Sequence, residues 1–313
     1  MTERQLIAMP DGRKLEFLTA GPDDGLPLVI HEGTPVGLGI YPPTVEAARI
    51  RGLRVIQIAR PGYERSTPRP GRRVGDIGAD AGVVMDYLGA DTFVTAGWSG
   101  GGPHALACAV LLPGRCLAAA SVAGVAPHDA EGLDWTEGMA PENVAEFGAA
   151  VSGPDQLTEY LQREAEGLTS VTGPEVAAAL GGLVSAVDVA ALTGEYAEAM
   201  AAGLRAAIRE GVAGWRDDDL AFVTDWGFSL GGIKELLGED LGPAPISIWQ
   251  GDQDRMVPFA HGAWLARHIP GARQHLLRGE GHLTLTVSAI DRILDDLLDL
   301  ADLSRLLAGP RDR

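Results

Sequence analysis

A serine surrounded by glycines is the first feature of this chain with a clear chemical use. Ser99 lies in the segment Gly97-Trp98-Ser99-Gly100-Gly101, between a β-prone run, 92–96, and an apolar run of helical character, 105–112. A serine on a sharp turn between a strand and a helix needs small neighbours, and its hydroxyl then lies beside the free N–H groups and positive dipole end of the helix. We therefore predict that Ser99 is a nucleophile rather than a serine that only shapes a turn.

Two later loops contain the groups that a serine nucleophile needs. A serine hydroxyl requires a base that takes its proton and an acid that orients the base. The loop 251–258 contains Asp252 and Asp254, and His282 follows the next predicted strand. We predict that His282 is the base and Asp254 the acid, with Asp252 as the alternative acid.

These motifs resemble those of the α/β-hydrolase superfamily, and the resemblance spans roughly residues 5–301. It rests on the segments 31–35 (His-Glu-Gly-Thr-Pro), 97–101, 251–258 and 281–282. Members of the superfamily have the acid at the fourth position of Gly-X-X-Asp-X-X-Val-Pro, which matches Asp254. The resemblance implies an α/β fold with a mostly parallel sheet flanked by helices, acyl transfer in two steps, and no cofactor.

The resemblance also implies an oxyanion hole formed by the backbone N–H groups of Thr34 and Gly100. The chain departs from its relatives at Glu32, where they often have a second histidine or another small motif. A carboxylate beside a developing oxyanion is unfavourable, so we expect Glu32 to point away from the hole or to be paired.

Aromatic residues are the candidates for the walls of a substrate pocket. Trp98, beside the serine, is expected either to line the pocket or to pack in the core. Trp226 and Phe228 are expected as hydrophobic walls. We interpret His104 as structural and His31 as a hydrogen-bonding loop residue.

Composition excludes several classes of partner. The formal charge of −18 leaves no basic surface for nucleic acid. The chain has no apolar run of about 18 residues and no apolar N-terminal segment, so we expect a cytoplasmic protein without a membrane partner. Cys108 and Cys116 are expected as buried free thiols, and no residue cluster has metal-ligand spacing. A small-molecule substrate is the expected partner, and the oligomeric state stays open.

The elements that must position these residues alternate between strands and helices. A hairpin is expected first, with Pro10-Asp11-Gly12 as its turn. Apolar strands that alternate with helical runs indicate βαβ units and a mainly parallel sheet. The expected strands are 28–30, 54–59, 92–96, 117–122, 245–250 and 273–277, and the expected helices are 43–50, 76–88, 105–112, 259–268 and 287–300.

Residues 127–230, here called the insert, interrupt this alternation. The insert has almost no strand signal, and helices are expected over 142–151, 154–167, 174–188 and 195–210. Between residues 129 and 225 it contains 19 Asp and Glu against four Arg. We predict a hydrolase core, 1–126 and 231–307, a helical cap formed by the insert, and a short tail, 308–313.

Hydrolysis of a carboxylic ester or lactone is the function expected first. An aminopeptidase that resembles proline iminopeptidases is one alternative, because cap carboxylates could hold a substrate ammonium. A hydrolase-fold binding protein, an acyl-transfer or cyclising biosynthetic enzyme, and perhydrolase-type halogenation are the others.

Overall fold

The computed structural model describes residues 2–230 and 244–307, which build an eight-stranded sheet. The strand order is β1-β2-β4-β3-β5-β6-β7-β8. All strands from β4 to β8 in this order run parallel, whereas β1 and β2 are antiparallel to their neighbours. The strands are β1 (Glu3–Ala8), β2 (Lys14–Ala20), β3 (Leu26–His31), β4 (Leu53–Ile58), β5 (Phe93–Trp98), β6 (Cys116–Val122), β7 (Ile246–Gly251) and β8 (Arg273–Leu277).

Local sequence explains the hairpin and the central strands. Gly12 has φ +86°, a conformation that glycine adopts without cost, and the Met9 N–H donates to the Arg13 carbonyl across the turn. Every residue of β6 is buried, as expected for a parallel strand that is covered by helices on both faces. The predicted α/β class with a mainly parallel sheet is confirmed.

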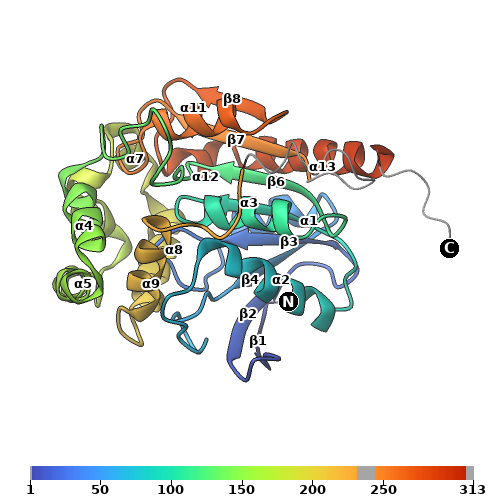
Figure 1. Ribbon diagram of the computed structural model, residues 1–313, viewed down its shortest axis with the longest axis horizontal. Helices are drawn as coiled ribbons and strands as arrows, with labels where there is room; N and C mark the ends of the chain where they lie inside the picture. The colour runs from blue at the N-terminus through green and yellow to red at the C-terminus, as the bar shows by residue number, and fades with distance from the viewer. Residues whose placement is uncertain (1, 231–243, 308–313) are drawn as a thin grey trace.

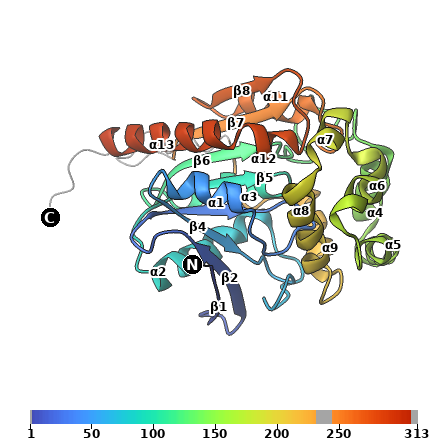
Figure 2. The same ribbon diagram turned by 180° about the vertical axis from the view of Figure 1, so that it is seen from behind.

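Helices cover both faces of the sheet. Helices α2 and α3 lie on the face turned toward the viewer in Figure 1, and α1 and α13 lie on the face seen in Figure 2. The core between these layers includes the predicted free thiols Cys108 and Cys116, both buried. The helices outside the insert are α1 (Pro42–Arg49), α2 (Ile77–Tyr87), α3 (Gly101–Leu111), α11 (Phe259–His268), α12 (Thr284–Ser288) and α13 (Ile290–Leu307).

The helices of the insert gather at one end of the molecule in both views (Figures 1 and 2). The predicted helix 174–188 is wrong as a single element. It is broken at Gly181, which has φ +53°, and a capping box between Ser185 and Asp188 starts a new helix. The helices are α4 (Pro141–Ser152), α5 (Pro154–Leu168), α6 (Val176–Leu180), α7 (Ala186–Ala191), α8 (Gly194–Ala207) and α9 (Ala213–Phe222), of which α9 was not predicted.

The last predicted helix, 287–300, also differs from the structure. Residues 284–288 form the separate short helix α12, Ala289 is its C-cap, and α13 starts at Ile290. The predicted tail, 308–313, and the first part of the predicted C-terminal core segment, 231–243, lie outside the described residues.

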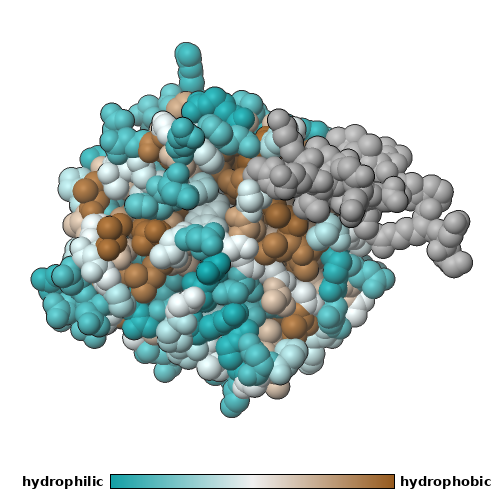
Figure 3. All heavy atoms as spheres, viewed as in Figure 1, coloured by the Kyte–Doolittle hydropathy of each residue, from teal (hydrophilic) through white to brown (hydrophobic). Residues whose placement is uncertain are grey.

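The surface of the described chain is mixed in character. Hydrophobic patches are small and separated by hydrophilic atoms on the face shown in Figure 3, and the outer end of the insert around α5 is hydrophilic. Among the described residues, no helix is both long and apolar enough to cross a membrane.

Candidate active site

Ser99 lies on a tight turn between β5 and α3. Its φ of +56° is in the left-handed region, where a residue with a side chain is strained. The turn leaves no room for side chains on either side: a Cβ at Gly97 would lie 2.0 Å from the Gly101 carbonyl oxygen, and one at Gly101 would lie 1.9 Å from the His31 carbonyl oxygen. The glycines around Ser99 are therefore required by close backbone contacts.

Asp254 and His282 are in contact although 28 residues separate them. The Nδ1 atom of His282 and Oδ2 of Asp254 are 2.8 Å apart, and both side chains are fully buried. The Oδ1 atom of Asp254 accepts hydrogen bonds from the N–H groups of Met256 and Val257, at 2.9 and 2.8 Å. In the described part of the chain, His282 Nε2 has no hydrogen-bond partner.

Asp252, the alternative acid, lies elsewhere on the same loop. It is exposed, and its Oδ1 accepts from the Gly279 N–H at 2.8 Å, so it holds two loops together. No hydrogen bond to His282 is formed by Asp252, whereas Asp254 contacts the imidazole directly.

Ser99 and His282 line one cavity of about 320 Å³. The predicted oxyanion residues Thr34 and Gly100 and the predicted wall residue Trp98 line it too. The backbone N–H groups of Thr34 and Gly100 form no backbone hydrogen bond with any described residue. The structure therefore brings residues from three separate segments of the chain to one cavity, here called the Ser99 cavity.

A buried ion cluster fixes the loop that contains Thr34. The Thr34 hydroxyl donates to Oδ2 of Asp218 at 2.8 Å, and the Arg60 guanidinium bonds both that carboxylate and the carbonyls of Glu32 and Gly33. Burial by itself would raise the pKa of Asp218, but the Arg60 and Arg72 guanidinium groups hold it well below its usual value. Asp218 belongs to α9, the helix that sequence reasoning missed.

The two histidines near the turn are buried among backbone groups. His104 Nδ1 lies 2.8 Å from the Gly100 carbonyl oxygen, and burial lowers the pKa of His104 to about 3. His31 ends β3, contacts Cys108 and has a pKa that burial holds well below its usual value. Both imidazoles are neutral at pH 7, so neither carries charge into the Ser99 cavity.

Glu32 is paired, as the sequence led us to expect. Its Oε1 accepts from Gln57 Nε2 at 2.5 Å, and the side chain lines a different cavity from the one that contains Ser99. Burial raises the pKa of Glu32 to about 7, against the opposing effects of Arg60 and Gln57. Its carboxyl is therefore kept apart from the Thr34 and Gly100 N–H groups.

The expectation that Trp226 and Phe228 form pocket walls is wrong. Their rings pack against each other, with centroids 5.8 Å apart, and neither residue lines the Ser99 cavity. The Trp226 carbonyl accepts from the Gly75 N–H, which holds this segment against the core. Phe222, the last residue of α9, lines the cavity instead.

The insert gives the Ser99 cavity an acidic wall. Glu142, Glu146, Glu164 and Asp219 line it together with a single cation, Arg163. Trp215 Nε1 donates to Glu146 at 2.8 Å, and burial raises the pKa of Glu146 to about 7. Burial and the neighbouring Glu146 also raise the pKa of Asp219 well above its usual value, because two adjacent buried carboxylates repel each other.

A carboxylate of the insert also holds the loop that contains His282. Asp188, in α7, is completely buried and accepts from the backbone N–H groups of His282, Leu283 and Thr284, at 3.2, 2.7 and 3.2 Å. A Cβ at Gly281 would lie 2.3 Å from this carboxylate. The glycine before His282 thus makes room for Asp188, a contact that the sequence pattern did not reveal.

A protein-family model described as "alpha/beta hydrolase fold" matches residues 27–288 of this chain. The chain belongs to the α/β hydrolase family. The resemblance inferred from its motifs is confirmed.

Individual relatives are more distant. A non-heme chloroperoxidase from Streptomyces lividans is 31% identical over 148 residues, which are 47% of this chain and 54% of that protein. The chain therefore spans about half the length of this curated relative. A hydrolase from Pseudomonas aeruginosa PA01 has a TM-score of 0.65 at 20% identity, with 94% of this chain and 98% of that chain covered. An enol-lactonase from Burkholderia xenovorans LB400 has a TM-score of 0.61 at 17% identity, with 94% of this chain and 100% of that chain covered. At these identities, the structural likeness concerns the fold.

Among the residues that the structure describes, no group of three or more His, Cys, Asp or Glu side chains is arranged to hold a metal ion.

Proposed function

We propose that this enzyme hydrolyses a carboxylic ester or lactone, with Ser99, His282 and Asp254 as its catalytic residues. The observation that carries the proposal is the 2.8 Å contact between His282 and Asp254, which leaves His282 Nε2 without a partner beside the cavity that Ser99 lines. Asp254 can only accept a hydrogen bond from Nδ1, so Nε2 is the nitrogen that receives a proton from serine.

The reaction follows from this arrangement in two steps. The Ser99 oxygen attacks the carbonyl carbon as its proton moves to His282 Nε2, and the N–H groups of Thr34 and Gly100 bind the oxyanion. The protonated His282 then gives its proton to the leaving alcohol, and the acyl group stays on Ser99. A water molecule, deprotonated by His282, attacks the acyl-enzyme, and His282 returns that proton to the Ser99 oxygen as the acid leaves.

In this proposal the insert acts as a cap that selects the substrate. Helices α4, α5, α8 and α9 supply much of the wall opposite Ser99, including Phe147, Leu168 and Phe222. A cavity of about 320 Å³ favours a compact ester or lactone.

Hydrolysis of p-nitrophenyl esters from acetate to octanoate tests the proposal. Wild type should hydrolyse the shorter esters, and Ser99→Ala should lower kcat by roughly 10³-fold or more because the nucleophile is lost. Ser121→Ala is a matched control, since this buried β6 serine does not line the cavity. An inactive wild type, or a Ser99→Ala variant as active as wild type, would contradict the proposal.

The acidic wall supports an aminopeptidase as the second candidate. Four carboxyl groups and one guanidinium line the Ser99 cavity, a balance that suits a substrate ammonium. Comparison of a prolyl-arylamide with a p-nitrophenyl ester separates the two candidates. Arylamide cleavage at the higher kcat/KM would favour the aminopeptidase, and absence of arylamide cleavage would eliminate it.

A further inference from the structure

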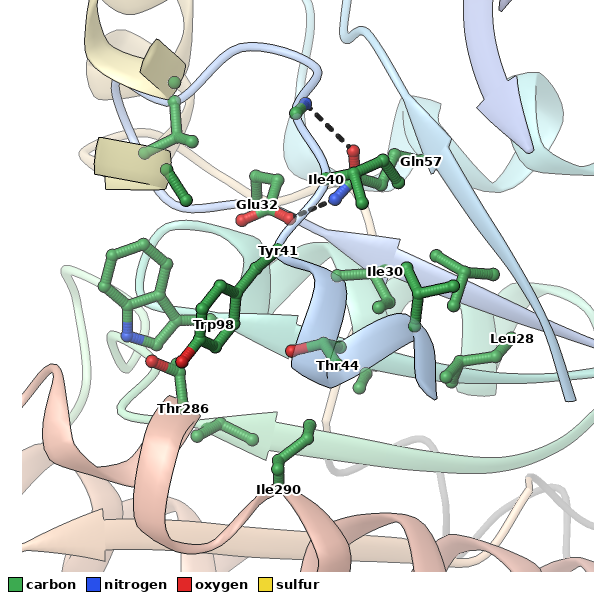
Figure 4. A pocket seen from close by; sticks show the side chains of 18 of the residues that line it. Leu28, Ile30, Glu32, Ile40, Tyr41, Thr44, Gln57, Trp98, Thr286 and Ile290 are labelled. Atoms are coloured by element: carbon green, nitrogen blue, oxygen red, sulfur yellow. Dashed lines mark hydrogen bonds between the residues drawn. The ribbon is translucent and has the colours of Figure 1, made fainter. Parts of the chain in front are cut away.

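A second cavity lies beside the Ser99 cavity and is not used by the proposed reaction. Its volume is about 130 Å³, and it lies between the sheet and helices α1 and α13 (Figure 4). Val36, Trp98 and Met200 line both cavities, whereas Ser99 and His282 do not line the second one. We call this second space the side cavity.

Most of the side cavity is hydrocarbon. Leu28 and Ile30 of β3 lie opposite Ile290 of α13, and Val45 of α1 adds a further apolar wall. Protein cores rarely leave spaces of this size, because the lining side chains lose their packing contacts. An apolar cavity of about 150 Å³ is large enough to bind benzene. The side cavity is therefore close to the size of one six-membered ring.

The side cavity is also lined by polar residues: the pair Gln57 and Glu32, and the hydroxyl-bearing Tyr41, Thr44, Tyr196 and Thr286. Gln57 Oε1 accepts from the Gly39 N–H at 3.1 Å, and this contact orients the amide so that Nε2 donates to Glu32 Oε1 at 2.5 Å. Glu32 Oε2 forms no hydrogen bond with any described residue, and Figure 4 shows it directed away from Gln57. Glu32 is half-buried, and its Oε2 can meet a ligand hydroxyl in the side cavity.

The protonation of Glu32 defines the ligand chemistry further. Burial raises its pKa to about 7, so the neutral and ionised forms are both present near neutral pH. Oε1 already accepts from Gln57, so the neutral form places its proton on Oε2. A ligand hydroxyl can accept from that proton or donate to the ionised oxygen, whereas a ligand carboxylate would repel the ionised form.

We propose that the side cavity binds a small apolar compound with one hydroxyl group, of the size and type of a phenol. The hydroxyl lies at Glu32 Oε2, and the ring lies between β3 and α13. The inference does not depend on Ser99 as the nucleophile, because no residue of the triad lines this space.

Calorimetric titration of the full-length protein with phenol tests the site, and toluene is the matched ligand without a hydroxyl. Val45→Phe fills the cavity from α1 and should weaken phenol binding by about tenfold or more. Val151→Phe is the matched control, because Val151 is 61% exposed on α4 and does not line the cavity. The control should bind phenol as wild type does.

Glu32→Leu tests the hydroxyl contact separately. Wild type should prefer phenol to toluene by about tenfold, and Glu32→Leu should abolish this preference while toluene still binds. Thr44→Leu, also on α1, replaces Val45→Phe if circular dichroism shows that the larger residue prevents folding. Failure of wild type to bind phenol, or phenol binding by the filled variant as tight as by wild type, would overturn the proposal.

Discussion

At the scale of single residues, Asp254 determines which nitrogen of His282 carries a proton. Its Oδ1 accepts from two backbone N–H groups, and its Oδ2 accepts from Gln250 Nε2 at 2.9 Å and from His282. All four neighbours act as donors to an ionised carboxylate. Nδ1 of His282 must therefore carry the proton, and Nε2 presents its lone pair to the cavity.

This geometry predicts the effect of Asp254→Asn. The oxygen of the new amide must stay where two backbone N–H groups meet it, so its NH2 group faces Gln250 and His282. The imidazole then accepts at Nδ1 and carries its proton on Nε2, where it cannot act as a base. We expect kcat to fall by about 10⁴-fold while the protein stays folded, as measured with an active p-nitrophenyl ester.

Asp252→Asn is the matched control for that variant, because Asp252 is exposed on the same loop and contacts Gly279. Its kcat should stay within about threefold of wild type. A larger loss in Asp252→Asn than in Asp254→Asn would assign the acid to the alternative residue.

Glu32 gives a prediction about stability and pH. Its pKa is raised on folding from 4.5 to about 7 because the carboxyl is buried, so the folded state binds more protons than the unfolded state in this interval. The free energy of unfolding should therefore fall as pH rises from 4.5 to 7, by up to about 3 kcal/mol, and change no further above that range. In Glu32→Gln, which has no carboxyl group at this position, the free energy of unfolding should not show this fall.

Urea unfolding of wild type and Glu32→Gln at pH 5 and pH 8 measures the difference. The free energy of unfolding of Glu32→Gln minus that of wild type should be larger at pH 8 than at pH 5. Glu3→Gln, at an exposed glutamate of β1, is the matched control for the loss of one carboxylate. If the difference between variant and wild type is the same at both pH values, folding does not raise the pKa of Glu32.

At the scale of elements, α7 couples the insert to the loop that contains His282. Asp188 accepts from three consecutive backbone N–H groups that start at His282, and it also accepts from the Ser185 hydroxyl at 2.7 Å. Asp188→Ala leaves those N–H groups without acceptors, and the imidazole is then less firmly positioned. We expect kcat to fall by about 10²-fold with little change in KM.

Three comparisons separate this positioning role from a general loss of stability. Asp188→Asn keeps one acceptor oxygen and should recover part of kcat, and Asp155→Ala, at an exposed carboxylate of α5, should leave kcat unchanged. Thermal unfolding measures the stability of each variant. If Asp188→Ala lowers the melting temperature but not kcat at a temperature where it is folded, the positioning role is wrong.

The elements that could be predicted from the sequence are those with strong local signals. The hairpin at Gly12, the alternation of strands and helices, and the turn at Ser99 follow from glycine positions and hydrophobic periodicity. The contact of His282 with Asp254 was predicted from motif order, and the structure brings these two side chains together.

Elements controlled by distant contacts could not be predicted in this way. Asp218 pairs with Arg60 across 158 positions, and Asp188 bonds the backbone of residues more than 90 positions away. Helix α9 contains three consecutive buried aspartates, Asp217 to Asp219, which resemble a solvent-exposed turn when read locally. Asp218 is paired with Arg60 and Arg72, contacts that the local sequence does not show.

At the scale of the whole molecule, charge is distributed in a way that affects substrate choice. The chain carries a formal charge of −18, and the wall of the Ser99 cavity contains four carboxyl groups against one arginine. A cavity whose lining carries mostly one sign of charge concentrates its electric field, since the low-dielectric walls screen little. The net charge and the cavity wall therefore both disfavour an anionic substrate.

Two esters of similar size test this effect. We expect p-nitrophenyl hemisuccinate, which ends in a carboxylate, to have a kcat/KM about tenfold or more below that of p-nitrophenyl butyrate, which is neutral. Added salt screens the repulsion, so an increase from 20 to 500 mM NaCl should raise kcat/KM for the hemisuccinate and leave that for the butyrate almost unchanged.

A pair of variants tests the same effect. Glu164→Gln removes one wall carboxylate with little change in shape and should reduce the difference in kcat/KM between the two esters. Glu166 does not line the cavity, so Glu166→Gln should leave this difference unchanged. Equal kcat/KM values for the two esters at low salt would show that the wall carboxyl groups are neutralised, in which case the acidic wall does not select substrates by charge.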